Sequence, residues 1–211
     1  MCICGLIFGL CIALGMQLAP GLAGPCKNAA GESARVSSVV DGETLVLTDG
    51  REVRLLGILA PVEPPNWESS EDWPFAVEAR QALAQLVGRG PVSLKFDTRK
   101  GDRYGHLLAH IHVARDSGAI WIQESLIAKV LAWVAAQPDI GACRIPLLAA
   151  EAEAREARRG IWRSLTYQIL DAQNPTMLGH RRHTYQLVEG QVFGIGEGKK
   201  SVYINFGEDW R

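Results

Sequence analysis

The chain has 211 residues, of which 47% are hydrophobic, and its 22 basic and 23 acidic side chains leave a formal net charge of -1. This composition excludes general disorder and allows one domain of ordinary size with appended segments. The near-neutral charge excludes long-range attraction of the whole chain to a polyanion, so binding of nucleic acid would require a local basic patch.

The first 25 residues have the composition of an export signal. They contain no charged side chain, are apolar through Leu18 and end in small residues, with Gly21 and Ala23 at positions suited to signal-peptidase cleavage. We therefore predict a signal peptide over residues 1–24 and an exported protein, periplasmic or secreted, with no other transmembrane segment. Because Lys and Arg are missing from the first residues, an uncleaved N-terminal membrane anchor and a misplaced start codon are the alternatives.

The five cysteines divide between the signal and the rest of the chain. Cleavage would remove Cys2, Cys4 and Cys11 and leave Cys26 and Cys143. One pair of cysteines in an oxidising compartment indicates either a disulfide between Cys26 and Cys143 or two unrelated thiols.

Residues 35–59 alternate β-rich runs with the turn signal Asp-Gly, which occurs at 41–42 and at 49–50. This pattern predicts three antiparallel strands joined by two tight turns. A helix is predicted next, with Asp72 as its cap, Pro74 in its first turn and Gly88 after its end. Its apolar stripe comprises Phe75, Ala79, Leu83, Leu86 and Val87.

The following elements complete a small domain. Strands are predicted over residues 92–97 and 106–113, a short helix over 120–130, and a longer helix over 147–159 with Gly160 as its C-cap. The longer helix carries its acidic residues early and its basic residues late, as the helix dipole favours. Three strands, a helix, two strands and two helices describe a small α+β barrel with helices packed on it.

The pattern weakens after Trp162 and resumes as a predicted hairpin over residues 186–211, with its turn at 196–200. Because an isolated hairpin is marginally stable in water, it must pack on the main domain or begin a second, incomplete β unit. We therefore divide the chain into the signal, a main domain over 35–163 and a C-terminal extension over 164–211.

Five blocks of sequence, taken in order between Val36 and Trp162, resemble the staphylococcal nuclease, or thermonuclease-like, family. The blocks are VVDGETLVL, VRLLGILAP, a helix that contains EAR, DRYGHLLAHI and AEAREARRGIW. The resemblance implies a five-stranded OB-fold β-barrel with three helices, here followed by the C-terminal hairpin. It also implies calcium-dependent cleavage of the phosphodiester bonds of DNA and RNA. The tail INFGEDWR resembles extensions that follow this domain in some exported bacterial members.

Phosphodiester hydrolysis needs a hard cation held by carboxylates, an activated water and cationic groups that stabilise charge on the phosphate. By the resemblance, Glu43 stands at the family's first carboxylate position, and Arg54 and His106 stand at its two arginine positions. Leu59 and Val62 replace the metal-binding Asp and the base-like Glu, and neither side chain can bind calcium or orient water. The resemblance therefore implies a degenerate site in which Arg54, Glu43 and His106 occupy the catalytic positions.

Glu63 follows the lost base position by one residue. A slip of one residue in this proline-rich loop would turn its carboxylate inward, so Glu43 and Glu63 are the candidate metal ligands of a rebuilt site. The alternative for Glu63 is a solvated acid in a loop that is acidic through residues 68–72. The alternative to phosphate binding for Arg54 is a salt bridge with Glu43 across the hairpin.

His106, His110 and His112 occupy alternate positions of one predicted strand, so their imidazoles would share one face. Closely spaced imidazoles bind zinc or copper. The alternative is that they are polar aromatic side chains on a barrel strand.

Two further pairs are candidate binding residues. Arg103 and Tyr104, in a turn that also contains the basic residues 99–100, are placed to contact a phosphate backbone. Trp67 and Trp73 flank the acidic loop and are suited to stack on a sugar or base. The alternatives are solvated charges in the turn and indoles that close the mouth of the barrel.

Three functions remain open. The first is a catalytically degenerate binding module of the cell envelope, which uses the old pocket for an unidentified small ligand. The second is a metal-dependent phosphodiesterase, acting on DNA or RNA through a rebuilt site. The third is an interaction domain that contacts an envelope protein through the C-terminal hairpin. No cofactor is expected, and calcium only if the site is rebuilt; nucleic acid is a partner that the sequence allows but does not favour.

Overall fold

The computed structural model describes residues 31–65, 67–68, 71–97, 99–135, 138–181 and 184–207. The predicted signal peptide and Cys26 lie outside these ranges. Within them, no helix has both the length and the apolar character needed to cross a membrane.

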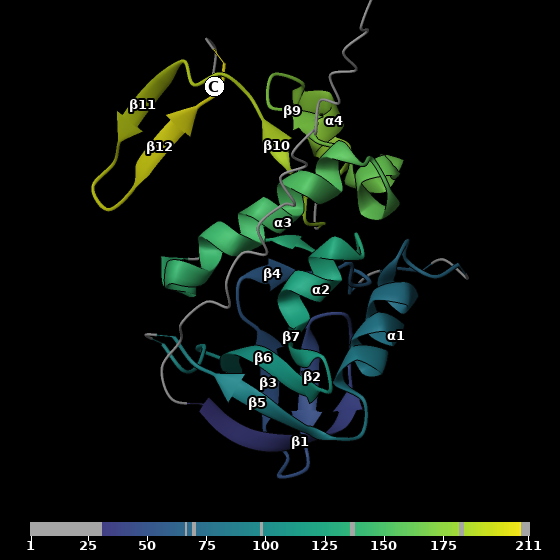
Figure 1. The fold of residues 1–211 in the computed structure, drawn as a ribbon. Coiled ribbons are helices and arrows are strands. Elements are labelled where there is room, and N and C mark those ends of the chain that lie inside the picture. Colours follow the sequence, from purple (N-terminus) through teal and green to yellow (C-terminus); the bar gives the residue numbers. More distant parts are fainter. Residues whose placement is uncertain are drawn as a thin grey trace, which may run out of the picture.

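Five strands close into a barrel (Figure 1). They lie in the order β3-β2-β1-β5-β6, and a parallel pairing of β3 with β6 completes the ring. A further strand, β7 (Gly118–Trp121), pairs with the C-terminal part of β6, from His112 to Arg115. The barrel strands are β1 (Gly31–Val39), β2 (Thr44–Leu47), β3 (Glu52–Leu55), β5 (Pro91–Lys95) and β6 (Leu107–Arg115). The predicted five-stranded α+β barrel is confirmed.

The two Asp-Gly turns form as predicted, because each aspartate carboxylate accepts a backbone hydrogen bond within its turn. Oδ1 of Asp41 accepts from the N–H of Glu43 at 2.8 Å, and Oδ1 of Asp49 accepts from the N–H of Arg51 at 3.0 Å. Strand β1 starts earlier than predicted and changes partner along its length, since its first part pairs with β5 and its last part with β2. An irregularity between Val36 and Ser38 accommodates the change.

Helix α1 (Ala76–Val87) packs on the barrel through a stripe of buried residues, which are Ala79, Ala82, Leu83 and Val87. The predicted cap is wrong, because the helix begins after Phe75 rather than after Asp72. Phe75 has a left-handed backbone with φ of 64° and forms no side-chain cap hydrogen bond. The preceding Trp73 is buried, with 8% of its surface exposed.

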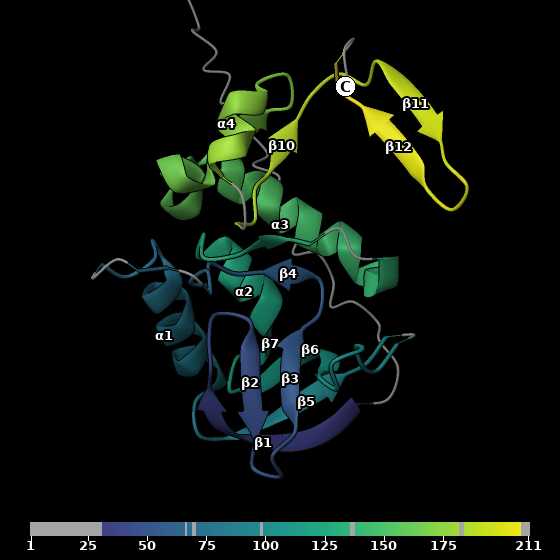
Figure 2. The same cartoon turned by 180° about the vertical axis from the view of Figure 1, so that it is seen from behind.

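The two later helices cover one end of the barrel (Figures 1 and 2). Helix α2 (Ile122–Ala128) contacts α1, α3 and β6, and helix α3 (Arg144–Glu156) lies across it. Helix α3 ends with Ala157 as its C-cap, so the prediction of Gly160 as the cap is wrong. Gly160 instead has φ of 52° and begins a short 3-10 helix where a Cβ would lie 2.6 Å from the carbonyl oxygen of Val130.

Short elements connect the barrel to the extension and also form the extension itself. Strand β4 (Ile58–Leu59) pairs with β8 (Trp133–Val134), and β9 (Leu170–Asp171) pairs in parallel with β10 (Val188–Glu189). In the chain, helix α4 (Pro175–His180) follows β9 and precedes β10. Short 3-10 turns occur at 138–143, 160–163 and 165–167.

A hairpin of β11 (Gly194–Glu197) and β12 (Val202–Asn205) ends the described chain. Its turn lies at residues 198–201, later than predicted, and the stretch before Val192 forms β10 instead of continuing the hairpin. In both views the hairpin projects from the rest of the molecule (Figures 1 and 2).

Candidate binding cleft

The carboxylate of Glu43 lies at the centre of the candidate site. Glu43 is 3% exposed, and both of its oxygens have internal partners. Oε1 is paired with the guanidinium of Arg54, and Oε2 accepts a hydrogen bond from the N–H of Ala60 at 2.8 Å. The salt bridge across the hairpin, one of the two roles considered for Arg54, is therefore present.

Burial and ion pairing have opposite effects on the pKa values of Glu43 and Arg54. Burial raises the pKa of Glu43 above its ordinary value, although the N–H of Ala60 and the charge of Arg54 act to lower it. Burial would lower the pKa of Arg54, but the nearby Glu43 carboxylate outweighs it and the pKa is raised. Both oxygens of the Glu43 carboxylate are therefore occupied, and the carboxylate holds the loop at Ala60 against the barrel.

A hollow of about 220 Å³ opens beside Glu43. Leu59 and Val62, at the positions where the resemblance implies carboxylates, line it, and so does Glu63. Glu63 is exposed and forms no ion pair with any described residue. Two carboxylates therefore border the hollow, one of them buried and paired and the other in contact with solvent.

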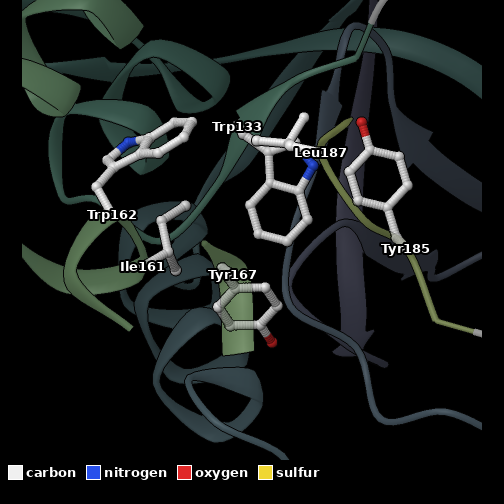
Figure 3. Close-up of a pocket in the computed structure, with 6 residues that line it drawn as sticks. All are labelled: Trp133, Ile161, Trp162, Tyr167, Tyr185 and Leu187. Carbon is white, nitrogen blue, oxygen red and sulfur yellow. The ribbon is translucent and has the colours of Figure 1, made fainter. Parts of the chain in front are cut away.

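The C-terminal extension forms the other wall of this hollow. Its lining includes Thr184 and Tyr185, together with Trp133, Tyr167 and Trp73. The ring of Tyr185 stacks on Trp133 with centroids 5.3 Å apart and an interplanar angle of 17°, and Tyr167 lies 5.1 Å from the same indole. Figure 3, which draws an adjoining pocket that shares these three rings, shows Tyr185 beside Trp133 and Tyr167 below it. The cleft is therefore an aromatic pocket shared by the barrel and the extension.

The predicted tryptophans lie at the edge of the same cleft. Trp67 meets Trp73 edge to face, with centroids 4.8 Å apart, and its Nε1 donates to the carbonyl of Glu71 at 2.8 Å. Both indoles line a neighbouring hollow that shares Trp73 and Thr184 with the first. Of the two tryptophans, Trp73 lines the cleft, and Trp67 lines only the neighbouring hollow.

The other predicted binding residues lie elsewhere. His106 is held between two carboxylates, with Nδ1 2.8 Å from Asp102 and Nε2 3.1 Å from Glu52. Arg103 lies over the ring of Tyr104 at 4.8 Å, and Tyr104 is exposed. None of these residues lines the cleft that contains Glu43. In Asp102, burial would raise the pKa, but hydrogen bonds from His106 and from backbone N–H groups outweigh it and lower the pKa.

The three histidines do not form a joint site. His110 and His112 lie on β6 and are buried, whereas His106 precedes the strand and binds Asp102. His112 stacks in parallel with Trp121 at 6.1 Å, and His110 meets the same indole at 5.4 Å. No group of three or more His, Cys, Asp or Glu side chains among the described residues is arranged to hold a metal ion.

Because His110 and His112 are buried, we expect the protein to lose stability in acid. None of their four ring nitrogens has a hydrogen-bond partner among the described groups, and burial lowers the pKa of each imidazole to about 4. The charge of Lys95 also lowers the pKa of His112, whereas Asp97 acts to raise that of His110. Because the unfolded chain binds these protons near pH 6.5, stability is complete above that pH and is lost as the pH falls towards 4.

We expect the free energy of unfolding to fall by about 2 kcal/mol between pH 7 and pH 5.5 through these two groups. Urea unfolding at both pH values measures this fall in free energy. The double variant with His110→Phe and His112→Phe should lack it. The exposed His180→Gln is the control. Equal pH dependence in the wild type and the double variant would contradict the assignment.

Cys143 is buried and disulfide-bonded. Its predicted partner, Cys26, lies outside the described residues, so the pairing stays a prediction.

Several cleft residues were not found from the sequence. Trp133, Tyr167, Thr184 and Tyr185 come from the last 80 residues, and no local motif marks them. The segment from 162 to 185 holds three aromatic side chains, Trp162, Tyr167 and Tyr185, which is too few to mark a site in the sequence.

A five-stranded barrel closed by a parallel β3–β6 pair, with an arginine–carboxylate pair beside the loop that follows β4, defines an OB-fold domain of the nuclease type. The family described as staphylococcal nuclease homologue matches residues 52–164, which is more than half of the chain. The chain belongs to this family. A comparison with curated proteins gives no match.

Proposed function

We propose that this protein is a catalytically degenerate member of the staphylococcal nuclease homologue family, which acts as a binding module in the cell envelope. The observation that supports the proposal is which residues line the cleft and how they are paired. Its buried acid, Glu43, is tied to Arg54 and Ala60, and apart from Glu63 and Thr184 the rest of its lining is apolar or aromatic.

The donor set does not fit calcium. Calcium takes six to eight oxygen ligands, several of them from carboxylates. Leu59 and Val62 contribute no oxygen from their side chains, and both oxygens of Glu43 already have partners. We therefore derive no catalytic step through a metal ion at this cleft.

The position of the extension also supports a binding role. A nuclease site must admit a polymer, but Thr184 and Tyr185 form a wall next to Glu43, Pro61 and Glu63. A hollow that the extension walls off beside Glu43 suits a small ligand better than a strand of nucleic acid. Location in the envelope rests on the apolar, uncharged first 25 residues.

A phosphodiesterase with a rebuilt site is the second candidate. The observation that favours it is that Glu63 borders the same hollow as Glu43. Two carboxylates are too few for a calcium cage, so this function would require ligands from the substrate.

The two functions separate in a cleavage assay. We expect residues 25–211, incubated with single-stranded DNA or RNA and calcium, manganese or zinc, to show no metal-dependent cleavage. We also expect calcium titration to give no saturable change in tryptophan fluorescence. Cleavage that disappears in Arg54→Ala would overturn the proposal.

A matched variant tests the assignment of positions. Combining Leu59→Asp, Val62→Glu and His106→Arg restores the side chains that the family resemblance implies. Saturable calcium binding by this triple variant, absent from the wild type, is the expected result. If the variant is folded and binds no calcium, the assignment of these positions is wrong.

A further inference from the structure

We propose that the cleft beside Glu43 binds an organic cation with a compact apolar body, of the trimethylammonium type. This inference rests on the proposed binding function and names the class of ligand. The closely packed aromatic side chains and the sign of the charge in the cleft carry it.

The first observation is the set of aromatic rings around the hollow. Trp73, Trp133, Tyr167 and Tyr185 all line it, and they come from four separate segments of the chain. Stacking of Tyr185 on Trp133 and the contact of Tyr167 with Trp133 fix the rings relative to one another. Tyr185 is 46% exposed, so its face away from Trp133 is the aromatic face most available to a ligand.

The rings are held in place before any ligand binds. The hydroxyl of Tyr167 donates to the carbonyl of Pro74 at 2.8 Å, which joins the extension to the segment before α1. Trp73, Trp133 and Tyr167 are each less than a tenth exposed. Because these rings are already packed, a ligand that contacts them binds without a large loss of side-chain entropy.

The second observation is the charge of the lining. Glu43 and Glu63 are its ionisable acids, and the described lining contains no Lys, Arg or His. Arg54 neutralises Glu43, so the unpaired negative charge at the hollow is that of Glu63. The adjoining hollow is lined by His180 and Arg181, so the test includes a phosphate ligand.

Aromatic faces and carboxylates together select cations. The face of an indole or phenol ring carries negative electrostatic potential and attracts an ammonium group within about 6 Å of its centre. A carboxylate at the rim adds a direct charge interaction, which is larger where water is excluded. A methylated ammonium has few N–H groups to satisfy, so apolar walls suit it better than they suit a primary amine.

The size of the hollow agrees with this class. Its volume of about 220 Å³ is below the range of about 300–1,000 Å³ typical of pockets for drug-sized ligands. A polymer of nucleotides would not fit, whereas a headgroup of six or seven heavy atoms would.

The experiment compares choline with 3,3-dimethylbutan-1-ol, its neutral carbon analogue of the same shape. Binding to residues 25–211 is measured by calorimetry and by tryptophan fluorescence at low and at physiological salt. We expect choline to bind at least about tenfold more tightly than the neutral analogue, with weaker binding at higher salt. Thymidine monophosphate is the phosphate ligand, and it should not compete.

Two variants locate the site, each with a control. Glu63→Gln should weaken choline binding by about fivefold. Its control is Glu68→Gln in the same loop, which lines no described part of the hollow. Tyr185→Leu should weaken choline more than the neutral analogue, whereas the exposed Tyr104→Leu outside the cleft should change neither.

Equal affinity for choline and the alcohol would overturn the inference, and so would tighter binding of thymidine monophosphate. Unchanged choline binding in both Glu63→Gln and Tyr185→Leu would also overturn it. These results leave the proposed function in place, because that proposal fails only if the protein cleaves DNA or RNA.

Discussion

Replacing Tyr167 by alanine should lower the free energy of unfolding by about 3–4 kcal/mol. Tyr167 is 8% exposed, and its ring lies 5.1 Å from Trp133 and 6.5 Å from Phe75. Its hydroxyl donates to Pro74 at 2.8 Å. Removal of the ring leaves a cavity between the barrel and the extension and an unpaired carbonyl at Pro74. Urea denaturation at pH 7 measures the loss.

Two variants control this result. Tyr167→Phe keeps the ring and removes one hydrogen bond, so it should cost about 1 kcal/mol. Tyr203→Ala removes a ring that is 58% exposed on the hairpin and should change stability by less than about 0.5 kcal/mol. If Tyr167→Ala were no more destabilising than Tyr203→Ala, the packing of the extension on the barrel would be wrong.

Replacing Arg54 by alanine should cost about 3 kcal/mol at pH 7. The carboxylate side chain of Glu43, only 5% exposed, would remain buried with the N–H of Ala60 as its one partner. Part of Arg54 is exposed, which keeps the loss below that of a fully buried pair. Denaturant unfolding at several pH values gives the measurement.

The pH dependence identifies the cause. Without Arg54, the pKa of Glu43 rises further, so the folded state takes up a proton more readily than the unfolded state. The destabilisation should therefore shrink as the pH falls from 7 towards 5. Adding Glu43→Gln to Arg54→Ala should recover part of the loss at pH 7, because no charge is then buried alone. A loss independent of pH, unaltered by Glu43→Gln, would rule out the ion pair as its source.

The barrel could be predicted because its signals are local. The Asp-Gly turns and the alternation of residues on either side of them specify the first hairpins, and the apolar stripe of α1 is visible in sequence. Strand β7 was missed because its end runs directly into α2. The boundary between β7 and α2 is set by the pairing of Trp121 with His112, which is not visible in sequence.

The cleft could be predicted only in part. Glu43, Arg54 and Glu63 lie close in sequence on a hairpin and its loop, so their proximity follows from the strands. Tyr185 reaches the same hollow by packing of the extension, which depends on contacts between distant segments. The resemblance also stops near Trp162 and therefore carries no information about this wall.

The parallel pairing of β3 with β6 has a consequence for how the protein folds. Val53 pairs with Leu107, so the ring cannot close until a segment far along the chain has been made. Until then β3 has one strand neighbour, and Leu55 lacks the pairing with Ala109 that completes this part of the core. Closure over such a separation in sequence makes folding slow compared with that of a helical domain of similar size.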